Sequence, residues 1–206
     1  MLAEKADAPF DSEQYLFEIK WDGIRCLAFI ERGHVRLQSR QLTEMTSQFP
    51  ELACLNQLPS GTVVDGELVV LQDGRPSLRQ IQRRTFLQNH ARIHCLSQRT
   101  PVTYMVFDLL YLNGEPLLAA PLNHRREALE NLIRRTPVPG VLASEAVAEH
   151  GCKLFAQVAV LGLEGVMAKR FDSPYLPGKR SRNWFKIKPR LSPQLLMATT
   201  AMANTL

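Results

Sequence analysis

Lys20, together with Glu18, Asp22 and Arg25, forms the first group of polar residues whose types and spacing could do chemistry. The group lies in the stretch FEIKWDGIR, at the end of an alternating pattern and beside bulky apolar side chains. An amine, a guanidinium and two carboxylates gathered there could serve polar chemistry in a cleft. The alternative, which this stretch taken alone favours, is a hairpin whose Asp-Gly turn is flanked by solvated charges.

Three further groups interrupt apolar segments in the same way. Asp65 and Glu67 lie inside TVVDGELVVL, as an exposed turn or as carboxylates aimed into a cleft. Glu164 follows an apolar helical stretch, where a Glu-Gly pair usually marks only the end of a helix. Lys186 and Lys188 share a strand face with a tryptophan, and the alternative there is an edge strand whose lysines discourage aggregation. Each group alone is weak evidence for a functional site, so the prediction of a site depends on all four groups occurring together.

The elements that must position these groups follow from the spacing of the apolar residues. Alternation predicts a strand at 15–21, a turn at Asp22-Gly23 and a strand at 26–31. The valine-rich stretch 62–71 predicts a strand pair, broken at Gly66 or carrying a bulge there. The remaining predictions are strands at 35–39, 102–112, 164–170 and 183–188, helices at 77–88, 121–135 and 152–163, the last of them buried, and a turn-rich basic loop at 172–182.

Strands in antiparallel-looking clusters, separated by few helices, favour an α+β domain over a doubly wound parallel sheet. We assign 1–190 to one domain and 191–206 to a tail, because that last stretch carries no charge. A net charge of +5 permits a polyanionic partner such as nucleic acid.

The cysteines and the apolar segments narrow the class of protein. None of the four cysteines belongs to a CxxC pair, which argues against a zinc site. No apolar segment has the length of a signal peptide or of a membrane span. The sequence therefore predicts a reduced, cytoplasmic protein without a membrane partner.

Six short stretches occur in an order that resembles the motifs of the covalent nucleotidyltransferases, which include ATP-dependent DNA ligases, RNA ligases and messenger-RNA capping enzymes. They are KWDGIR, LQSRQ, VVDGELV, VFDLLYLNG, LEGVMAKR and WFKIK. Two longer stretches, FDLLYLNGEPLLAAPLNHRREAL and GLEGVMAKRFDSPYLPGKRSRNWFKIKP, resemble DNA-ligase signatures. The resemblance covers roughly residues 10–189 and is to the adenylation domain of bacterial ATP-dependent DNA ligases.

This resemblance implies a fold and a reaction. The fold is α+β and ATP-grasp-like, with antiparallel-rich sheets flanked by helices and ATP between the sheets. Lys20 matches the nucleophile that attacks the α-phosphate of ATP to give lysyl-AMP, and Asp22 is expected to orient it. Because a free lysine is protonated at neutral pH, we expect the cations Arg25, Lys186 and Lys188 to lower its pKa.

The other implied roles concern nucleotide, metal and DNA. Adenine is expected at Glu18, the Ile19 backbone and Phe107, although without the resemblance plain core packing is the favoured interpretation of Phe107. Arg25 matches the ribose contact, and Lys186 and Lys188 match residues that hold phosphates. In full, the implied ATP site is Glu18, Ile19, Lys20, Arg25, Arg40, Glu67, Phe107, Lys186 and Lys188, the Mg²⁺ or Mn²⁺ ligands are Glu67 and Glu164, and the DNA contacts are Arg40, Lys179, Arg180 and Arg182.

Nicked double-stranded DNA is the partner that the resemblance implies, in repair, recombination or replication at the bacterial nucleoid. Family members continue into an oligonucleotide-binding (OB-fold) barrel, which we do not find in 191–206. We therefore expect a separate OB-fold module or a DNA-end-binding repair protein to be needed for full sealing. The alternatives are RNA ligation or capping, and a non-catalytic remnant that binds nucleotide or DNA.

Two sets of residues stay open at this point. Arg79, Arg83 and Arg84 could track a DNA backbone or form an ordinary solvated helix face. His90 and His94 have helical metal-ligand spacing, but a solvated face is the favoured interpretation.

Overall fold

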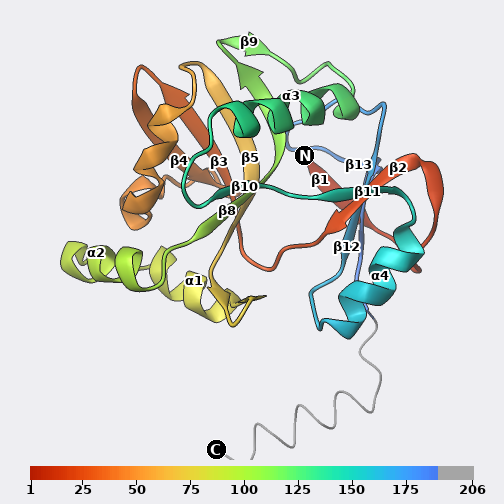
Figure 1. The fold of residues 1–206 in the computed structure, drawn as a ribbon, viewed down its shortest axis with the longest axis horizontal. Coiled ribbons are helices and arrows are strands. Elements are labelled where there is room, and N and C mark those ends of the chain that lie inside the picture. The colour runs from red at the N-terminus through yellow and green to blue at the C-terminus, as the bar shows by residue number, and fades with distance from the viewer. Residues whose placement is uncertain (190–206) are drawn as a thin grey trace, which may run out of the picture.

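Two β-sheets form the body of the protein in the computed structural model, which describes residues 1–189 (Figure 1). The tail predicted at 191–206 lies outside the described residues. The larger sheet has the order β10-β8-β5-β3-β4, with β9 beside β8, and the smaller sheet has the order β1-β13-β12-β2-β11. The strands are β1 (Leu2–Lys5), β2 (Ser12–Ile19), β3 (Ile24–Glu31), β4 (His34–Ser39), β5 (Thr62–Val69), β6 (Leu71–Gln72), β7 (Arg75–Pro76), β8 (Thr103–Leu112), β9 (Glu115–Pro116), β10 (Val141–Ala143), β11 (Ala146–Glu149), β12 (Val166–Arg170) and β13 (Arg180–Ile187). The helices are α1 (Leu78–Thr85), α2 (His90–Arg99), α3 (Leu122–Arg135), α4 (Gly151–Val160) and two 3₁₀ segments, η1 (Thr46–Gln48) and η2 (Pro50–Gln57).

The α+β class and the antiparallel-rich sheets are confirmed. Only β1 with β13 and β8 with β10 pair in parallel among the described strands, and every other pair is antiparallel. α3 packs on β8 and β10, and its Leu129 belongs to the same buried core as Ala28, Val64 and Val106 of the larger sheet. This burial of apolar area is the main source of stability for the larger sheet.

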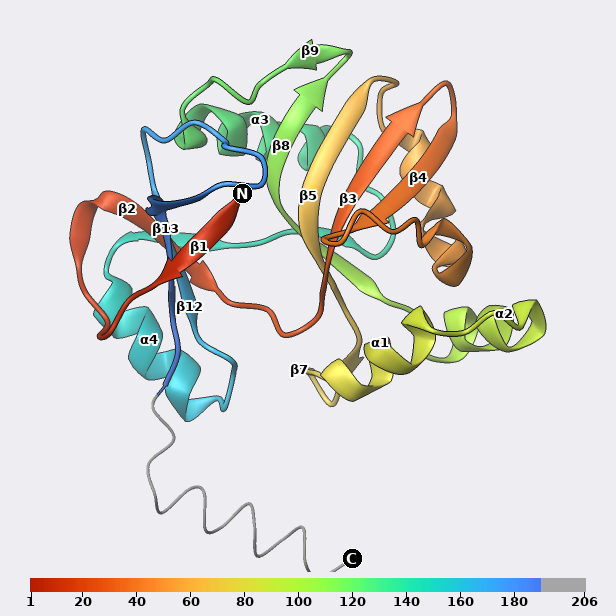
Figure 2. The same cartoon turned by 180° about the vertical axis from the view of Figure 1, so that it is seen from behind.

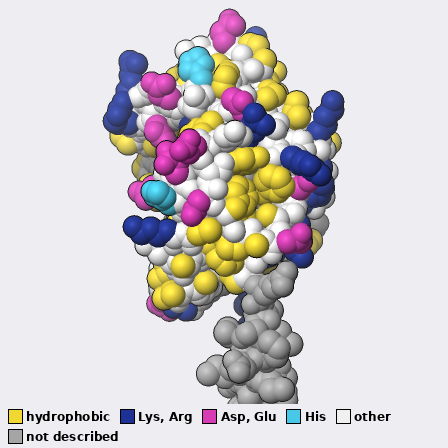
Figure 3. Space-filling view, turned by 90° about the vertical axis from the view of Figure 1, so that its right-hand side faces the viewer, with side chains coloured by type: hydrophobic (Ala, Val, Ile, Leu, Met, Phe, Trp, Pro, Cys, Tyr) yellow, Lys and Arg dark blue, Asp and Glu magenta, His cyan; other side chains and the backbone are white. Residues whose placement is uncertain are grey.

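The helix predicted at 152–163 exists as α4, but the prediction that it is buried is wrong. α4 covers one face of the smaller sheet, where Val158 packs with Phe17, Val166 and Ile187. Its other side faces outward, and the side chain of Val160 is 86% exposed. Figure 3, seen from the side of α4, shows apolar side chains gathered on this face of the molecule.

The stretch 62–71 gives one strand, β5, and not the strand pair that it also allowed. β5 stays continuous because it lies between β3 and β8 and pairs with both along its length. The predicted irregularity is present as a register shift between Asp65 and Gly66. A Cβ atom at Gly66 would lie 2.5 Å from the carbonyl oxygen of Met105, so only glycine fits this close approach.

Residues 20–23 carry the chain from β2 of the smaller sheet to β3 of the larger one (Figure 2). At the end of this crossing, a Cβ atom on Gly23 would lie 2.1 Å from the Leu68 carbonyl oxygen, so the backbones of the two segments touch. Trp21 fixes the middle of the crossing by donating its indole N–H to Ser144 Oγ at 3.2 Å. Lys20 is therefore held at the junction of the two sheets.

Candidate active site

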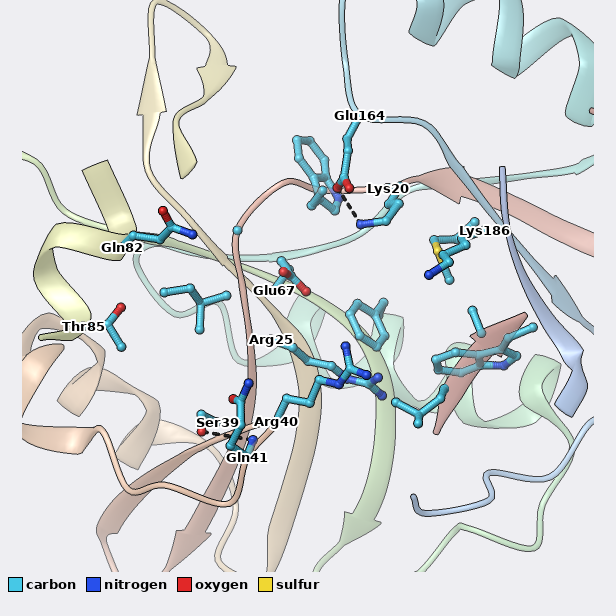
Figure 4. A pocket seen from close by; sticks show the side chains of 18 of the residues that line it. Lys20, Arg25, Ser39, Arg40, Gln41, Glu67, Gln82, Thr85, Glu164 and Lys186 are labelled. Carbon is cyan, nitrogen blue, oxygen red and sulfur yellow. Dashed lines mark hydrogen bonds and ion pairs between the residues drawn. The ribbon is translucent and has the colours of Figure 1, made fainter. Parts of the chain in front are cut away.

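A pocket of about 790 Å³ lies between the two sheets (Figure 4). Its walls come from β2, β12 and β13 of the smaller sheet, from β3, β5 and β8 of the larger one, and from α1. The predicted site residues that line it are Glu18, Ile19, Lys20, Arg25, Arg40, Glu67, Phe107, Glu164, Arg180, Lys186 and Lys188. Its size suits a nucleotide-sized ligand.

Lys20 lies beside Glu164, although 144 residues separate them along the chain. Lys20 Nζ is 2.5 Å from Glu164 Oε2, and the Lys20 backbone N–H donates to the Gly165 carbonyl at 2.8 Å. Lys188 Nζ reaches the other oxygen of the same carboxylate at 2.6 Å. Glu164 thus does more than end a helix, because it joins two of the lysines that the sequence singled out.

Gly165 allows Glu164 to take this position. Its φ of +151° lies in a region that side chains rarely adopt. A Cβ atom there would also lie 2.2 Å from the carbonyl oxygen of Ile187 in β13. The Glu-Gly pair before β12 is therefore required by the backbone of the site.

Arg25 forms its ion pair with Asp65, and not with Glu164, the carboxylate that faces Lys20. Its Nε donates to Asp65 Oδ1 at 3.0 Å, one terminal N–H donates to Asp65 Oδ2 at 2.6 Å, and the Tyr175 hydroxyl donates to the same Oδ2 at 2.8 Å. Burial alone would raise the pKa of Asp65, but the Arg25 guanidinium and these hydrogen bonds hold it below its ordinary value. The charge nearest to Lys20 is consequently that of Glu164, not that of Arg25.

Glu67 faces the pocket from β5 and forms no ion pair within residues 1–189. Burial, opposed by Lys20 and Arg25 and reinforced by Asp65 and Glu164, raises the pKa of Glu67 to about 8. Its carboxyl group is therefore mostly protonated at neutral pH. A carboxyl group in this state can donate a hydrogen bond, and it becomes an anionic ligand when it loses its proton.

The aromatic wall of the pocket contains Phe107 and Trp184, whose ring centroids are 6.0 Å apart at 80°. Lys169, which we did not predict, places its Nζ 3.9 Å from the Phe107 centroid, 4.4 Å from the Trp184 centroid and 2.5 Å from Glu18 Oε1. Burial lowers the pKa of Lys169, while Glu18 opposes this effect. Arg126 approaches Glu18 Oε1 as well, at 3.5 Å.

The signal for Lys169 was present in the alternation of β12. Val166 and Ala168 face the α4 side of the sheet, so Met167 and Lys169 must face the pocket. The predicted face of β13 behaves in the same way, because Trp184 and Lys186 both line the pocket. Burial and then the neighbouring Arg180 lower the pKa of Lys186.

Three predicted site residues do not line the pocket: Asp22, Lys179 and Arg182. Within residues 1–189, no hydrogen bond joins Asp22 to Lys20. Burial and the neighbouring Glu164 raise the pKa of Asp22. The Arg182 side chain is 87% exposed and lies 3.9 Å from Glu4. Both Arg180 and Arg182 belong to β13, so the basic loop predicted up to 182 ends earlier than expected.

The two sets of residues that the sequence left open, and the cysteines, also have defined positions in the structure. Arg84 does not belong to a solvated face or to a DNA track, because it is buried with Glu51 in a two-pronged ion pair. His90 and His94 are exposed on α2, and no group of three or more His, Cys, Asp or Glu residues in 1–189 could by itself hold a metal ion. The four cysteines are free. No described helix is both long and apolar enough to cross a bilayer.

Comparison with known proteins assigns this chain to a family. The family model described as "ATP dependent DNA ligase domain" matches residues 1–188. A DNA ligase of Methanoculleus marisnigri is 37% identical over 182 residues, which is 87% of this chain and 32% of the relative. The SPbeta prophage-derived DNA ligase-like protein LigB of Bacillus subtilis is 34% identical over 188 residues, which is 91% of this chain and 66% of the relative.

Solved structures of ligase domains have the same fold as this chain. The ligase domain of M. tuberculosis LigD superposes with a TM-score of 0.77 at 37% identity, over 91% of this chain and 58% of that one. A mycobacterial DNA ligase D complexed with ATP and MES gives a TM-score of 0.75 at 35% identity, over 90% of this chain and 59% of that one. The architecture is thus that of the ATP-dependent ligase domains. The chain belongs to the ATP dependent DNA ligase domain family, and it spans between about a third and two thirds of these curated relatives.

Proposed function

We propose that this adenylation domain forms a covalent lysyl-AMP on Lys20 and passes the AMP to the 5′-phosphate of nicked DNA. The observation that carries the proposal is the position of the Lys20 amine, which faces a nucleotide-sized pocket and touches Glu164 at 2.5 Å. In the first step the Lys20 nitrogen bonds to the α-phosphorus of ATP, the bond from that phosphorus to the bridging oxygen breaks, and pyrophosphate leaves. The Lys20 ammonium gives up two protons in becoming the phosphoramide nitrogen, and both pass to solvent, to which the Lys20 side chain is 22% exposed.

Glu164 controls the state of the nucleophile in this proposal. While Glu164 holds Lys20 and Lys188, the amine is paired with a carboxylate and is not free to attack. Glu164 would also hold Mg²⁺ or Mn²⁺, and a cation there would compete with the Lys20 amine for the carboxylate. Glu164 and ionised Glu67 offer the hard oxygen donors that these cations prefer, and phosphate oxygens would complete the ligand set. A bound cation would neutralise charge that develops on the phosphates.

The rest of the pocket binds and orients ATP. Phe107 presents an aromatic face for adenine, and Glu18 is held in place beside it by Lys169 and Arg126. Lys186 and Lys188 bind the α-phosphate and the departing pyrophosphate. These fixed cations favour the transition state because charge accumulates there on the phosphate oxygens.

The test is incubation of the purified chain with α-labelled ATP and Mg²⁺ or Mn²⁺, followed by a denaturing gel and peptide mass analysis. We expect an AMP adduct on Lys20 that is absent from Lys20→Ala and unchanged in Lys153→Ala, whose lysine is exposed on α4. Labelling that persists in Lys20→Ala would sink the assignment of the nucleophile.

The later steps concern DNA and extend the same proposal. Transfer of AMP to nicked DNA, compared with nicked RNA of the same sequence, tests the substrate. Faster transfer to RNA would favour an RNA ligase. We further propose that an OB-fold module or a DNA-end-binding repair protein takes part in nick sealing, with the protein working at the nucleoid.

A further inference from the structure

One continuous stretch of the chain carries more than the whole net positive charge. Residues 74–107 contain six arginines and neither aspartate nor glutamate. The full chain has 25 basic and 20 acidic residues, so the remainder has 19 basic and 20 acidic residues. Such a concentration of one sign is the electrostatic footprint of a polyanionic partner.

The first half of this stretch is α1, which buries one face and leaves the other charged. Ile81 is buried in the core, and Arg84 is tied to Glu51, with 2.6 Å between its NH1 and Glu51 Oε1. Arg79, Arg83 and Phe86 follow one another at intervals of four and three residues, so they share the outer face. Phe86 is 84% exposed and lines the mouth of the pocket that holds Lys20.

The second half is α2, which has the same two-sided character. Ile93 and Ser97 are buried, while Arg92 and Arg99, seven residues apart, are exposed on the opposite side. We call the residues Arg79, Arg83, Phe86, Arg92 and Arg99 the basic ledge. Figures 1 and 2 both place α1 and α2 one after the other along the same edge of the molecule.

Among the described residues, the arginines of the basic ledge have no carboxylate partner, which is also true of Arg40 and Arg180 in the pocket. Arg25, Arg84 and Arg125, in contrast, are all paired with carboxylates. Four unneutralised guanidinium groups on neighbouring helices do not stabilise one another, because their charges have the same sign. They gain most from a ligand that carries regularly spaced negative charges.

We propose that the basic ledge binds the phosphate backbone of duplex DNA beside the nick, with Phe86 covering a sugar or base at the mouth of the pocket. The inference rests on the proposed function, because the same DNA must bring its 5′-phosphate to Lys20. Phe86 is the member of the basic ledge that lines the pocket, and an exposed aromatic face in such a place suits a nucleotide better than it suits water.

The test is the salt dependence of binding of a fluorescent nicked duplex, measured by anisotropy on the full chain. Each phosphate contact contributes about 0.9 to the slope of log K against log salt. Arg79→Gln/Arg83→Gln should therefore reduce the slope by about 1.8, and Arg92→Gln/Arg99→Gln by a similar amount. The matched control is Arg134→Gln/Arg135→Gln, which removes two exposed arginines from the end of α3. Unchanged slopes in both ledge variants, or an equal loss in the control, would overturn the proposal.

Phe86→Ala gives an independent readout, since it changes no charge. We expect the salt slope to stay at the wild-type value and the preference for nicked over continuous duplex to fall about tenfold. An unchanged preference removes Phe86 from the interface. Stronger binding of an RNA duplex of the same sequence would overturn the assignment to DNA.

Lysyl-AMP formation, measured in the same samples, separates this inference from the proposed function. The ledge arginines lie outside the nucleotide-binding set, so their variants should form lysyl-AMP at the wild-type rate. Wild-type slopes in the ledge variants together with normal lysyl-AMP would refute the ledge alone. Reduced slopes in a protein that forms no lysyl-AMP would refute the proposed chemistry and leave the ledge standing.

Discussion

At the scale of single residues, the pocket is organised by which charged groups find a partner. Arg25 is neutralised by Asp65, and Glu18 is held by Lys169, so both pairs act as rigid walls. Burial leaves these charges dependent on each other, because a buried ion that loses its partner costs several kcal/mol. Within residues 1–189 Glu67 forms no ion pair, and burial raises its pKa to about 8 against the opposing charges of Lys20 and Arg25.

The raised pKa of Glu67 predicts that divalent cations bind with ATP more tightly as the pH rises. Below about pH 8 the carboxyl group is protonated, and a cation must displace that proton. The affinity should therefore grow up to about tenfold per pH unit from pH 6.5, and level off above about pH 8. Calorimetry with Mn²⁺ and ATP, in buffers that differ in ionisation enthalpy, measures the proton released.

Glu67→Gln should flatten this pH dependence and abolish the proton release. Glu44→Gln is the matched control, because Glu44 also lines the pocket but is exposed. The prediction fails if wild-type affinity stays flat between pH 6.5 and 8, or if the control flattens it equally.

At the scale of elements, buried ion pairs attach helices to the sheets. Arg125 of α3 lies against Asp108 of β8, with Nε to Oδ1 at 2.7 Å and a terminal nitrogen to Oδ2 at 2.9 Å, and both side chains are fully buried. The same guanidinium donates to the Ala120 and Ser173 carbonyls. One arginine thus fixes α3 to the larger sheet and to the segment that leads into β13.

Asp108→Asn should destabilise the protein by about 3–5 kcal/mol, because it leaves the Arg125 guanidinium buried without a compensating charge. Urea unfolding followed by circular dichroism gives the free energy of unfolding. Glu130→Gln removes the exposed partner of Arg126 on the same helix and should cost at most about 1 kcal/mol. Equal losses in the two variants would contradict the role of the buried pair.

The sequence predicted the elements better than it predicted their partners. Alternation in 15–21 and 26–31 was sufficient for β2 and β3, since the period of a half-buried strand is local. The pairing of Arg84 with Glu51 joins residues 33 positions apart, and no local period reports it. For this reason the sequence placed Arg84 on a surface, while the structure buries it.

For the candidate site, too, the sequence indicated the residues better than it indicated their partners. Most of the polar residues that the sequence singled out inside apolar segments line one pocket. The partner of Lys20 could not be derived from its own stretch, which offered Asp22 as the residue that orients it. Glu164 reaches Lys20 only because β12 and β2 pair in the smaller sheet and bring their ends together.

At the scale of the whole molecule, the pocket belongs to both sheets at once. Phe107 and Glu67 come from the larger sheet, while Lys186 comes from the smaller one, and the crossing at 20–23 links them covalently. A nucleotide that contacts both walls should therefore stabilise the two sheets together. Its effect on unfolding reports on the site even where no covalent chemistry occurs.

Saturating ATP should raise the melting temperature of the chain, because it binds the folded state alone. At a concentration of about 100 times the dissociation constant, the stabilisation is about 2.7 kcal/mol, which is roughly 5–10 °C for a domain of this size. Differential scanning fluorimetry of Lys20→Ala, which cannot form the adduct, isolates the effect of binding.

The decisive comparison takes one variant from each wall of the pocket. In the Lys20→Ala background, Phe107→Ala on the larger sheet and Lys186→Ala on the smaller sheet should each reduce the ATP-induced shift, whatever they do to the melting temperature without ligand. Lys153→Ala, outside the pocket on α4, should leave the shift intact. If only one wall matters, ATP does not bridge the sheets, because a ligand held by one sheet gains nothing from the other. A smaller ATP-induced shift in both variants would instead mean that residues of the two sheets act as one binding site.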